Sequence, residues 1–404
     1  MHRVAITGMG VICPLGKSIP DFWEALTRGQ TAIGPIELTD SSTLKCQNGA
    51  EVRDYDPGRF FDLQRSESID RFAQFALIAA RQAIEDAGVQ WSPELRSTAA
   101  VITGSCAGGQ SAVDKGFFEL YRRGRPRVHP LTIPKTMANA GASHIAIEFG
   151  ITGPAFTIST ACSSSAHAIG LAYTTIASGA VSLAIAGGSE APFSYGMLKA
   201  WEALRVISPT TCRPFSIDRN GMILGEAGAM IVLETMESAL ARGAHIHGEL
   251  AGFGMSSDAC HITHPSSDGA ASAMQRALKN AGIQPECIGY INAHGTGTEI
   301  NDSTESAAVR KVFGTHAEKL ALSSTKSMHG HTLGAAGALE AIASVLALGK
   351  GILPPTANFT QPDPRCSLDV VPNVARSAEV EYCLSNSFAF GGLNASLVFR
   401  RAYR

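Results

Sequence analysis

The sequence predicts an α/β protein built from two similar halves. Strand-like apolar runs alternate with helix-like runs along its 404 residues, and 41 glycines supply the tight turns that join such elements. Hydrophobic residues make up 45% of the chain and charged residues 17%, which is enough apolar material for a large core. We therefore expect mostly parallel sheets with helical cover in both halves.

The first half opens with an expected strand at residues 4–14, an apolar run interrupted by glycines. Residues 75–89 have the apolar spacing of an amphipathic helix that ends at a glycine, and a short strand follows at 98–102. The same helix, glycine and strand recur at 271–283 and 288–292. This recurrence indicates an internal duplication.

A second pair of segments supports the duplication. The first half has a helix at 163–177 followed by a strand at 181–187, and the second half has a strand at 320–323 followed by a helix at 333–348. Gly248 restarts a strand between them. We place the boundary near residue 250, which gives an N-terminal half of residues 1–250 and a C-terminal half of 251–404.

Composition excludes several classes of protein. A net charge of −2 argues against a nucleic-acid binder, and nine irregularly spaced cysteines without a Cys-x-x-Cys pair favour a reducing compartment. Residues 4–14 lack a small-residue cleavage site, so we interpret them as a strand and not as a signal peptide. No apolar run approaches the length of a membrane span. We expect a soluble, cytoplasmic protein that does not insert into membranes.

Cys162 is a candidate nucleophile, because it lies where a strand-like run turns directly into the helix at 163–177. The first turn of a helix has unpaired N–H groups and a positive dipole end. Both favour thiolate over thiol and can donate to an oxyanion beside the sulfur. A lone cysteine at such a junction is more often a small buried core residue, so the functional interpretation needs partners.

Two histidines in the second half are the candidate partners. His294 follows the strand at 288–292 among glycines, and His331 lies between the strand at 320–323 and the helix at 333–348. Either histidine alone is more often structural. One cysteine and two histidines that each end a strand indicate a catalytic set, which we expect where the two halves meet.

Four motifs resemble those of β-ketoacyl-acyl carrier protein synthases of the Cys-His-His type, with synthase II as the nearest branch. They are Thr-Ala-Cys-Ser-Ser at Cys162, Asn-Ala-His-Gly-Thr at His294, Lys-Ser-Met-x-Gly-His ending at His331, and Asn-Ser-Phe-x-Phe-Gly-Gly at 386–392. The resemblance covers essentially the whole chain. It implies a thiolase-type fold, with two duplicated halves whose mixed sheets are layered between helices.

The resemblance also implies the reaction, a decarboxylating Claisen condensation of an acyl thioester with malonyl-acyl carrier protein, without a cofactor. Cys162 would carry the acyl group in a ping-pong mechanism, and His294 and His331 would donate to the enolate oxygen. The N–H groups of Cys162 and Phe390 would bind the second oxyanion. Phe388 belongs to the same gate segment.

Lys326 and Glu340 complete the catalytic set by resemblance. The helix at 333–348 is otherwise almost uncharged, so we expect Glu340 to be buried and to need a partner. Lys326 would be that partner and would orient His331, although a Lys and a Glu more often form a solvated surface pair. Asp302 would order the loop after the first histidine.

The resemblance assigns substrate-binding regions as well. Ala107 stands where synthase II enzymes often carry a bulky Ile, and with Trp201 it would line the acyl pocket, although an apolar Trp is more often plain core. Thr296 and Thr298 would lie in the malonyl and pantetheine region. Ala389 replaces a common Gly in the gate motif, so acyl chain length and the choice between fatty acid and specialised or polyketide synthesis stay open.

The expected partner is an acyl carrier protein bearing phosphopantetheine thioesters, and the chain is expected to form a homodimer. Such carrier proteins are acidic, and the densest basic cluster surrounds Arg125 and Arg127. We expect the carrier protein to dock through these two residues and Arg205. A solvated loop that binds nothing is an equally plausible reading for any single Arg.

Three other functions are weighed against these residues. His329-x-His331 and His261-x-x-His264 have ligand-like spacing but no completing ligands, so we expect no metal. A thiolase would need a second cysteine in a glycine-flanked turn, which neither Cys366 nor Cys383 occupies. A non-elongating partner subunit of a heterodimeric synthase usually lacks the nucleophile, so it stays a minor alternative.

Overall fold

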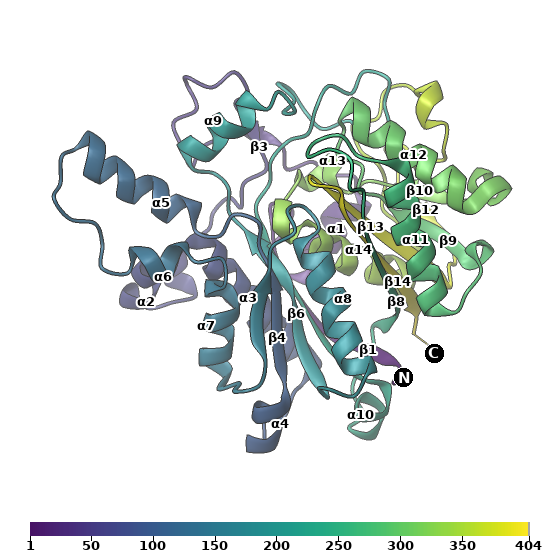
Figure 1. Cartoon of the computed structure of the whole chain (residues 1–404), viewed down its shortest axis with the longest axis horizontal. Helices are drawn as coiled ribbons and strands as arrows, with labels where there is room; N and C mark the ends of the chain where they lie inside the picture. The colour runs from purple at the N-terminus through teal and green to yellow at the C-terminus, as the bar shows by residue number, and fades with distance from the viewer. Residues whose placement is uncertain (403–404) are drawn as a thin grey trace.

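Ten strands form the main sheet of the structure, a computed structural model that describes residues 1–402 (Figure 1). The strands of the N-terminal half are β1 (Val4–Ile12), β4 (Ala100–Gly104), β5 (Ala155–Ile158), β6 (Leu183–Glu190) and β7 (Ala227–Thr235). Those of the C-terminal half are β8 (Gly248–Ser257), β9 (Ile288–Asn292), β10 (Ala321–Ser323), β13 (Tyr382–Ala389) and β14 (Leu393–Arg401). Their order is β10-β9-β13-β14-β8-β1-β7-β6-β4-β5. Short strands β2 (Gly34–Pro35) with β3 (Asn48–Gly49), and β11 (Ile352–Leu353) with β12 (Arg376–Ser377), form two separate ribbons.

The two halves share one topology, so the duplication extends to the sheet. In the first half β5, β4 and β6 run parallel, while β7 and β1 are antiparallel to their neighbours. In the second half β10, β9 and β13 run parallel, while β14 and β8 are antiparallel to theirs. The first strands of the halves, β1 and β8, pair antiparallel and join the two five-stranded units.

The expectation of mostly parallel pairing is wrong, because the sheet is mixed. The connection from β13 to β14 is a tight hairpin at residues 390–392, and a hairpin forces its two strands to run antiparallel. β6 and β7 are also antiparallel, although a long segment connects them. Each half therefore consists of three parallel strands and two antiparallel ones, and the antiparallel strands of both halves lie in the middle of the ten-stranded sheet.

Helices cover the sheet in layers. They are α1 (Ile19–Thr27), α2 (Leu63–Ser68), α3 (Arg71–Ala87), α4 (Pro93–Thr98), α5 (Gln110–Phe117), α6 (Thr132–Thr136), α7 (Ala140–Phe149), α8 (Ser164–Ala177), α9 (Tyr195–Ala203), α10 (Met236–Ala241), α11 (Ser267–Ala281), α12 (Glu299–Phe313), α13 (Lys326–His329) and α14 (Ala336–Lys350). α3 and α7 pack on the first half, and α11 packs on β8 and β14 of the second. α8 and α14 contact each other and lie between the halves, with α8 along β4 and β6 (Figure 1).

The central position of α14 explains its composition. Every residue from Ala336 to Leu348 is buried, as expected for a helix that is apolar on all faces. Together with the preceding turn, Leu333–Lys350 is long and apolar enough for a membrane span, which contradicts the expectation that no run approaches that length. It is 89% buried inside the fold, so its apolar character belongs to the core.

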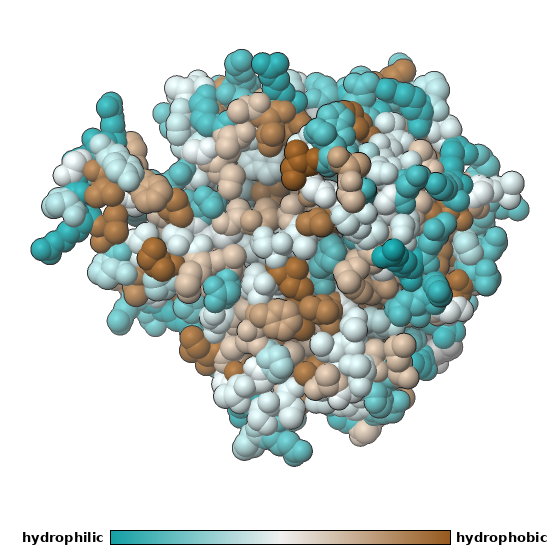
Figure 2. All heavy atoms as spheres, viewed as in Figure 1, coloured by the Kyte–Doolittle hydropathy of each residue, from teal (hydrophilic) through white to brown (hydrophobic). Residues whose placement is uncertain are grey.

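One segment projects from the body. α5, the π-helical turn Phe118–Arg122 and α6 extend away from the sheet at the left of Figure 1. Hydrophobic residues gather on this projection in Figure 2, and the exposed ones include Phe117, Phe118, Tyr121 and Ile133. β5, the edge strand of the first half, is also partly exposed, with Phe156 37% accessible.

Candidate active site

Cys162 lies in a strained turn between β5 and α8. Ala161, the residue before it, has a φ of 51°, which is a left-handed conformation that an alanine adopts only when its surroundings hold it there. The Ser163 hydroxyl donates to the carbonyl oxygens of Thr160 and Leu393, both at 2.8 Å. The turn that carries Cys162 is therefore fastened to the start of β14, in the other half of the chain.

A cavity of about 410 Å³ lies at Cys162 and is lined by residues of both halves, among them His294, His331, Phe388 and Phe390. The polar side-chain atoms of Cys162, His294 and His331 lie within 4.8 Å of one another. The structure thus brings together the cysteine of the first half and the two histidines of the second. All three side chains are buried.

His331 is held in one tautomer. The Leu333 N–H donates to His331 Nδ1 at 3.2 Å, so the proton of the neutral ring resides on Nε2. Nε2 is buried and has no partner. Burial, with the Lys326 ammonium nearby, holds the pKa of His331 well below its usual range. His331 therefore presents an unsatisfied N–H donor to the cavity side of the ring.

His294 is fixed through its backbone. Its N–H and that of Gly295 donate to the two carboxylate oxygens of Glu305 on α12, at 2.9 and 2.8 Å. The His294 and His331 rings meet edge to face with centroids 5.3 Å apart. Burial and Lys326 also hold the pKa of His294 well below its usual range. Both histidines are neutral at physiological pH.

Lys326 and Glu340 form a buried ion pair, in which the Lys326 ammonium donates to Glu340 Oε1 and neither side chain is exposed. The structure pairs them as the sequence predicts. Burial raises the pKa of Glu340 to about 7, and Lys326 opposes that rise. Glu340 Oε2 is buried without a partner. An ion pair without exposure acts strongly on its neighbours, because little water screens it.

The Cys162 thiol differs from the expectation based on the helix terminus. Burial raises its pKa to about 11, while Lys326 and the N–H groups of Phe390 and of Cys162 itself lower it. Desolvation penalises the thiolate more than the helix end stabilises it. The resting side chain is a thiol, and the two amides directed at its sulfur are those expected to bind an oxyanion.

Residues 386–392, the expected gate segment, contribute Phe388, Ala389, Phe390 and Gly392 to the lining of the cavity. Gly391 and Gly392 have φ values of 83° and 68°, a left-handed conformation that only glycine adopts readily, and they form the hairpin turn. The Phe390 ring stacks on Trp201 with centroids 6.2 Å apart and planes 24° from parallel. Phe388 lies edge to face against His294, with centroids at 6.2 Å.

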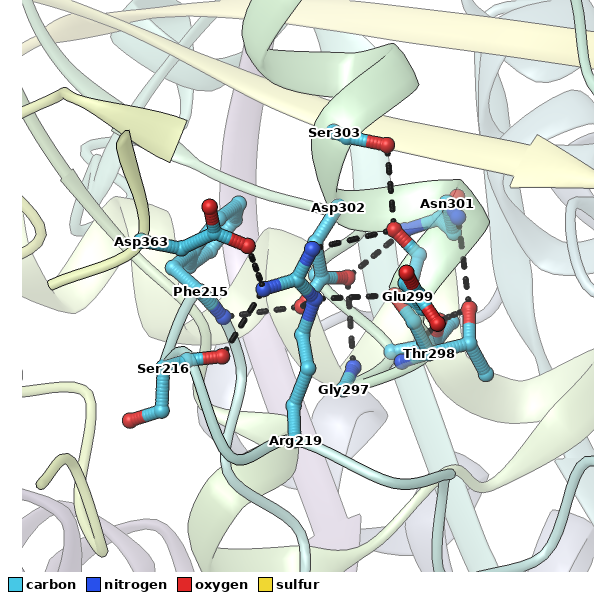
Figure 3. Close-up of polar contacts among 12 residues, drawn as sticks. Phe215, Ser216, Arg219, Gly297, Thr298, Glu299, Asn301, Asp302, Ser303 and Asp363 are labelled. Carbon is cyan, nitrogen blue, oxygen red and sulfur yellow. Dashed lines mark hydrogen bonds and ion pairs between the residues drawn. The ribbon is translucent and has the colours of Figure 1, made fainter. Parts of the chain in front are cut away.

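Arg219 fastens the loop that follows His294 (Figure 3). It is wholly buried, lines the cavity and donates to the Thr298 carbonyl at 3.3 Å and to the Asp363 carboxylate at 2.6 Å. Asp302 lies 3.7 Å from Arg219 and accepts the Gly297 N–H at 3.2 Å. Thr296 and Thr298, predicted for the malonyl and pantetheine region, both line the cavity and are 2.9 Å apart through their hydroxyls.

The structure separates two other predicted groups. Neither Ala107 nor Trp201, the two residues predicted for the acyl pocket, is among the residues that line the cavity. Trp201 and Cys106, the neighbour of Ala107, both pack against the apolar cluster that includes Leu198. Arg205 lines the cavity, but Arg125 and Arg127 line a different recess beside α5 and α6. The three arginines do not form one surface within a single chain.

Glu190 was missed by sequence reasoning. It is the last residue of β6, is wholly buried and accepts hydrogen bonds from both the β4–α5 turn and the turn after His331. A charged residue at the end of an apolar strand is the only signal in the sequence. That signal does not distinguish a functional carboxylate from one that faces solvent.

Cys162, His294 and His331 also have the donor types and spacing of a metal site, and they would suit a zinc ion. Within residues 1–402 they are the one such group. His329 is not part of it, since its ring nitrogens contact the Gly330 carbonyl and the Thr325 hydroxyl. His261 and His264 lie at the cavity and contact each other through Nδ1 atoms 3.0 Å apart.

Comparison with known proteins gives consistent matches over the full length. Residues 1–239 match the model of the β-ketoacyl synthase N-terminal domain, and 247–360 match that of the C-terminal domain. The chain is 45% identical to nodulation protein E of Rhizobium sp. over 400 residues, which is 99% of each chain. It is 42% identical to 3-oxoacyl-[acyl-carrier-protein] synthase 2 of Synechocystis sp. over 407 residues, covering 99% of this chain and 98% of the relative. The solved ishigamide ketosynthase/chain length factor superposes over 100% of both chains with a TM-score of 0.94 and 38% identity.

Proposed function

Because this chain belongs to the β-ketoacyl synthase family and is an acyltransferase-type condensing enzyme of thiolase-type fold, we propose that Cys162 carries its acyl intermediate. The observation that carries this proposal is the convergence of Cys162, His294 and His331 within 4.8 Å. The thiol faces two neutral imidazoles and two backbone donors in one buried cavity. The roles below follow from that arrangement.

The first half-reaction transfers the acyl group to Cys162. The sulfur attacks the thioester carbonyl, the bond to the carrier's pantetheine sulfur breaks, and that sulfur leaves as a thiol. Since burial raises the pKa of Cys162 to about 11, its proton must move as the bond forms. His294 is the ring that can accept this proton and pass it to the departing sulfur, because His331 Nε2 already carries a proton, so the step is proton-balanced. The N–H groups of Cys162 and Phe390 donate to the carbonyl oxygen as it becomes negative.

The second half-reaction removes carbon dioxide from a malonyl thioester. The carbon–carbon bond to the carboxylate breaks, and its electron pair moves onto the thioester as an enolate. His331 Nε2–H is an unsatisfied buried donor suited to that enolate oxygen, with His294 beside it. Neutral histidines suit this role, because an imidazolium would form an ion pair with the malonyl carboxylate and stabilise the group that must leave as carbon dioxide. The low pKa values of both rings support the assignment.

Condensation then joins the two. The enolate carbon attacks the acyl-Cys162 carbonyl, the new oxyanion occupies the same two N–H groups, and collapse expels the Cys162 sulfur as a thiolate. The thiolate takes up one proton from solvent, which balances the loss of the malonyl carboxylate as carbon dioxide. Lys326 neither donates nor accepts a proton in this scheme. Burial keeps both histidines deprotonated, and the positive charge of Lys326, which is paired with Glu340, adds to that effect.

The substrate carrier in this scheme is an acyl carrier protein, as the name of the relative from Synechocystis sp. states for that enzyme. We propose that it docks near Arg205, at the cavity, and that pantetheine enters past Thr296 and Thr298. The identities to nodulation protein E and to 3-oxoacyl-[acyl-carrier-protein] synthase 2 are similar, 45% and 42%, so they do not favour one acyl product over another. A reducing cytoplasm fits nine cysteines that are all free.

We propose a homodimer, with the projecting α5–α6 segment and the β5 edge as the contact surface. Exposed Phe117 and Tyr121 on the projection, and the accessible Phe156 of β5, form apolar area next to an unpaired strand edge. A related non-elongating subunit is the alternative partner at this surface, since the ishigamide structure includes a chain length factor. Native mass spectrometry of the purified chain distinguishes the two, because only a homodimer doubles the mass without a partner.

Separated half-reactions test the proposed function. Purified enzyme is incubated with an acyl-acyl carrier protein, freed of excess substrate and then mixed with malonyl-acyl carrier protein. The proposal expects stoichiometric β-ketoacyl product and carbon dioxide, unchanged by a metal chelator. If the chelator abolished turnover and zinc restored it, the three converging side chains would be metal ligands instead.

A further inference from the structure

Glu190 is a buried carboxylate for which the proposed reaction has no chemical step. Its Oε2 accepts N–H groups from Cys106 at 2.7 Å and from Gly334 at 3.1 Å. Its Oε1 accepts the Ser105 hydroxyl at 3.1 Å and the Ala107 N–H at 3.2 Å. A carboxylate with four donors and no exposure is rigidly held, because losing any acceptor leaves a buried donor unpaired.

These bonds join two segments that are distant in the sequence. Residues 105–107 follow β4 in the first half, whereas Gly334 follows His331 in the second. The two segments are in direct contact, since a Cβ at Gly334 would lie 2.5 Å from both Glu190 Oε2 and the Cys106 nitrogen. Glu190 therefore connects the β4–α5 turn to the turn that carries His331.

Leu333, which precedes Gly334 and lies two residues after His331, has a strained backbone. Leu333 has a φ of 48°, a left-handed conformation that is unfavourable for a leucine. This conformation directs the Leu333 N–H onto His331 Nδ1 and so leaves the proton on Nε2. Without an anchor at Gly334, the turn can relax and the N–H can leave the ring.

We propose that Glu190 is a positioning residue for His331, acting through Gly334 and the strained Leu333. The proposal rests on the proposed function, in which His331 Nε2–H donates to the enolate oxygen. Glu190 touches no reacting atom in this account. It holds the turn that fixes the tautomer and direction of the His331 ring.

The carboxylate also has an electrostatic effect that a neutral structural residue would lack. The charge of Glu190 raises the pKa of the Cys162 thiol, in addition to the larger effect of burial. Replacing Glu190 by Gln keeps the shape but removes the charge, so it should make Cys162 easier to ionise. The two half-reactions should therefore respond to Glu190→Gln in opposite directions.

The test compares wild type and Glu190→Gln in two assays, malonyl-acyl carrier protein decarboxylation and the pH dependence of Cys162 alkylation by iodoacetamide. We expect decarboxylation to fall on the order of 10- to 100-fold, the usual effect of losing a group that orients a functional His. The alkylation midpoint should move to lower pH. Decarboxylation within about twofold of wild type, or an equal loss in both assays, would overturn the proposal.

Two further variants separate charge from geometry. Gly334→Ala inserts a methyl group between the same partners without changing charge, so decarboxylation should fall while the alkylation midpoint stays. If Glu190→Gln does not fold, Gly334→Ala alone carries the test. Normal decarboxylation by that variant would then refute the proposal that the turn at Gly334 positions His331. Asp70→Asn is the matched control, because Asp70 is a buried carboxylate that accepts the Phe72 and Ala112 N–H groups away from the cavity.

The wild-type arm separates this proposal from the proposed function. If the wild-type enzyme neither acylates Cys162 nor decarboxylates malonyl-acyl carrier protein, the proposed function fails. If it does both and the two variants behave like wild type, the function stands and only the role of Glu190 is lost.

Discussion

The Leu333 N–H donates to His331 Nδ1 across 3.2 Å, so the second histidine of the site presents a fixed Nε2–H donor. His331→Ala removes that donor and should slow malonyl-acyl carrier protein decarboxylation by about 10²- to 10³-fold, as loss of one oxyanion donor does. Carbon dioxide release measures it. Acyl transfer to Cys162 should persist, because its oxyanion is bound by backbone N–H groups. Normal decarboxylation with lost acyl transfer would reverse the assignment.

Glu305 gives a prediction about stability and pH. Burial raises the pKa of this carboxyl to about 7, so the folded protein holds its proton at pH values where the unfolded chain has released it. The unfolding free energy should therefore fall as pH rises from about 4.5 to 7, by at most about 1.4 kcal/mol per pH unit for one proton. Glu305→Gln should flatten this part of the profile, as measured by denaturant titration at pH 5, 6 and 7. An unchanged slope would show that Glu305 titrates normally.

The apolar cluster beside Trp201, the expected location of the acyl pocket, gives a matched pair of substitutions at adjacent positions. Cys106 packs with Trp201 and Leu198, so Cys106→Ile should overpack the pocket and disfavour long acyl groups by roughly 1–3 kcal/mol. Ala107→Ile adds similar bulk one residue away and should change the profile less, because Cys106, and not Ala107, packs against the apolar cluster that Trp201 also contacts. Acylation rates of Cys162 with short, medium and long acyl carrier proteins measure both. A larger effect at Ala107 would restore the expectation from the sequence.

The carrier-docking prediction now distinguishes between arginines. Arg205 lines the cavity that holds Cys162, whereas Arg127 lies at a separate recess. Arg205→Glu should raise KM for carrier-bound substrates by about tenfold, equivalent to about 1.4 kcal/mol, and change KM for small pantetheine thioesters little. Arg127→Glu is the comparison variant, with a smaller effect expected on both. Equal increases for the two substrate forms would exclude docking at Arg205.

The sequence was most informative where a Cys or His side chain follows a predicted strand. Cys162 and His294 could be identified because each follows a strand and lies next to small residues. His331 lies farther from its strand, since α13 comes between β10 and this histidine, and the family motif that ends at His331 supports its identification. The burial of Glu340 followed from one charge in an otherwise apolar helix, whereas its pairing with Lys326 was implied by the family resemblance. The duplicated halves were visible in the recurring helix, glycine and strand.

What the sequence did not reveal depends on contacts between the halves. Glu190 binds backbone N–H groups, which every residue except proline carries, so nothing in the sequence marks its partners. Whether Cys106 or Ala107 packs near the acyl pocket depends on the turn after β4 and not on residue type. The raised pKa of Cys162 arises from burial of the thiol, whereas its own helix terminus suggested the opposite.

The most direct test of the account is the location of the covalent acyl group. Enzyme treated with acyl-acyl carrier protein is digested, and the peptides are analysed by mass spectrometry. We predict one acyl thioester, on the peptide that contains Cys162, which disappears when malonyl-acyl carrier protein is added and never forms in Cys162→Ala. An acyl group on Cys106 or another of the nine cysteines, or acylation of Cys162→Ala at the wild-type rate, would contradict the central claim.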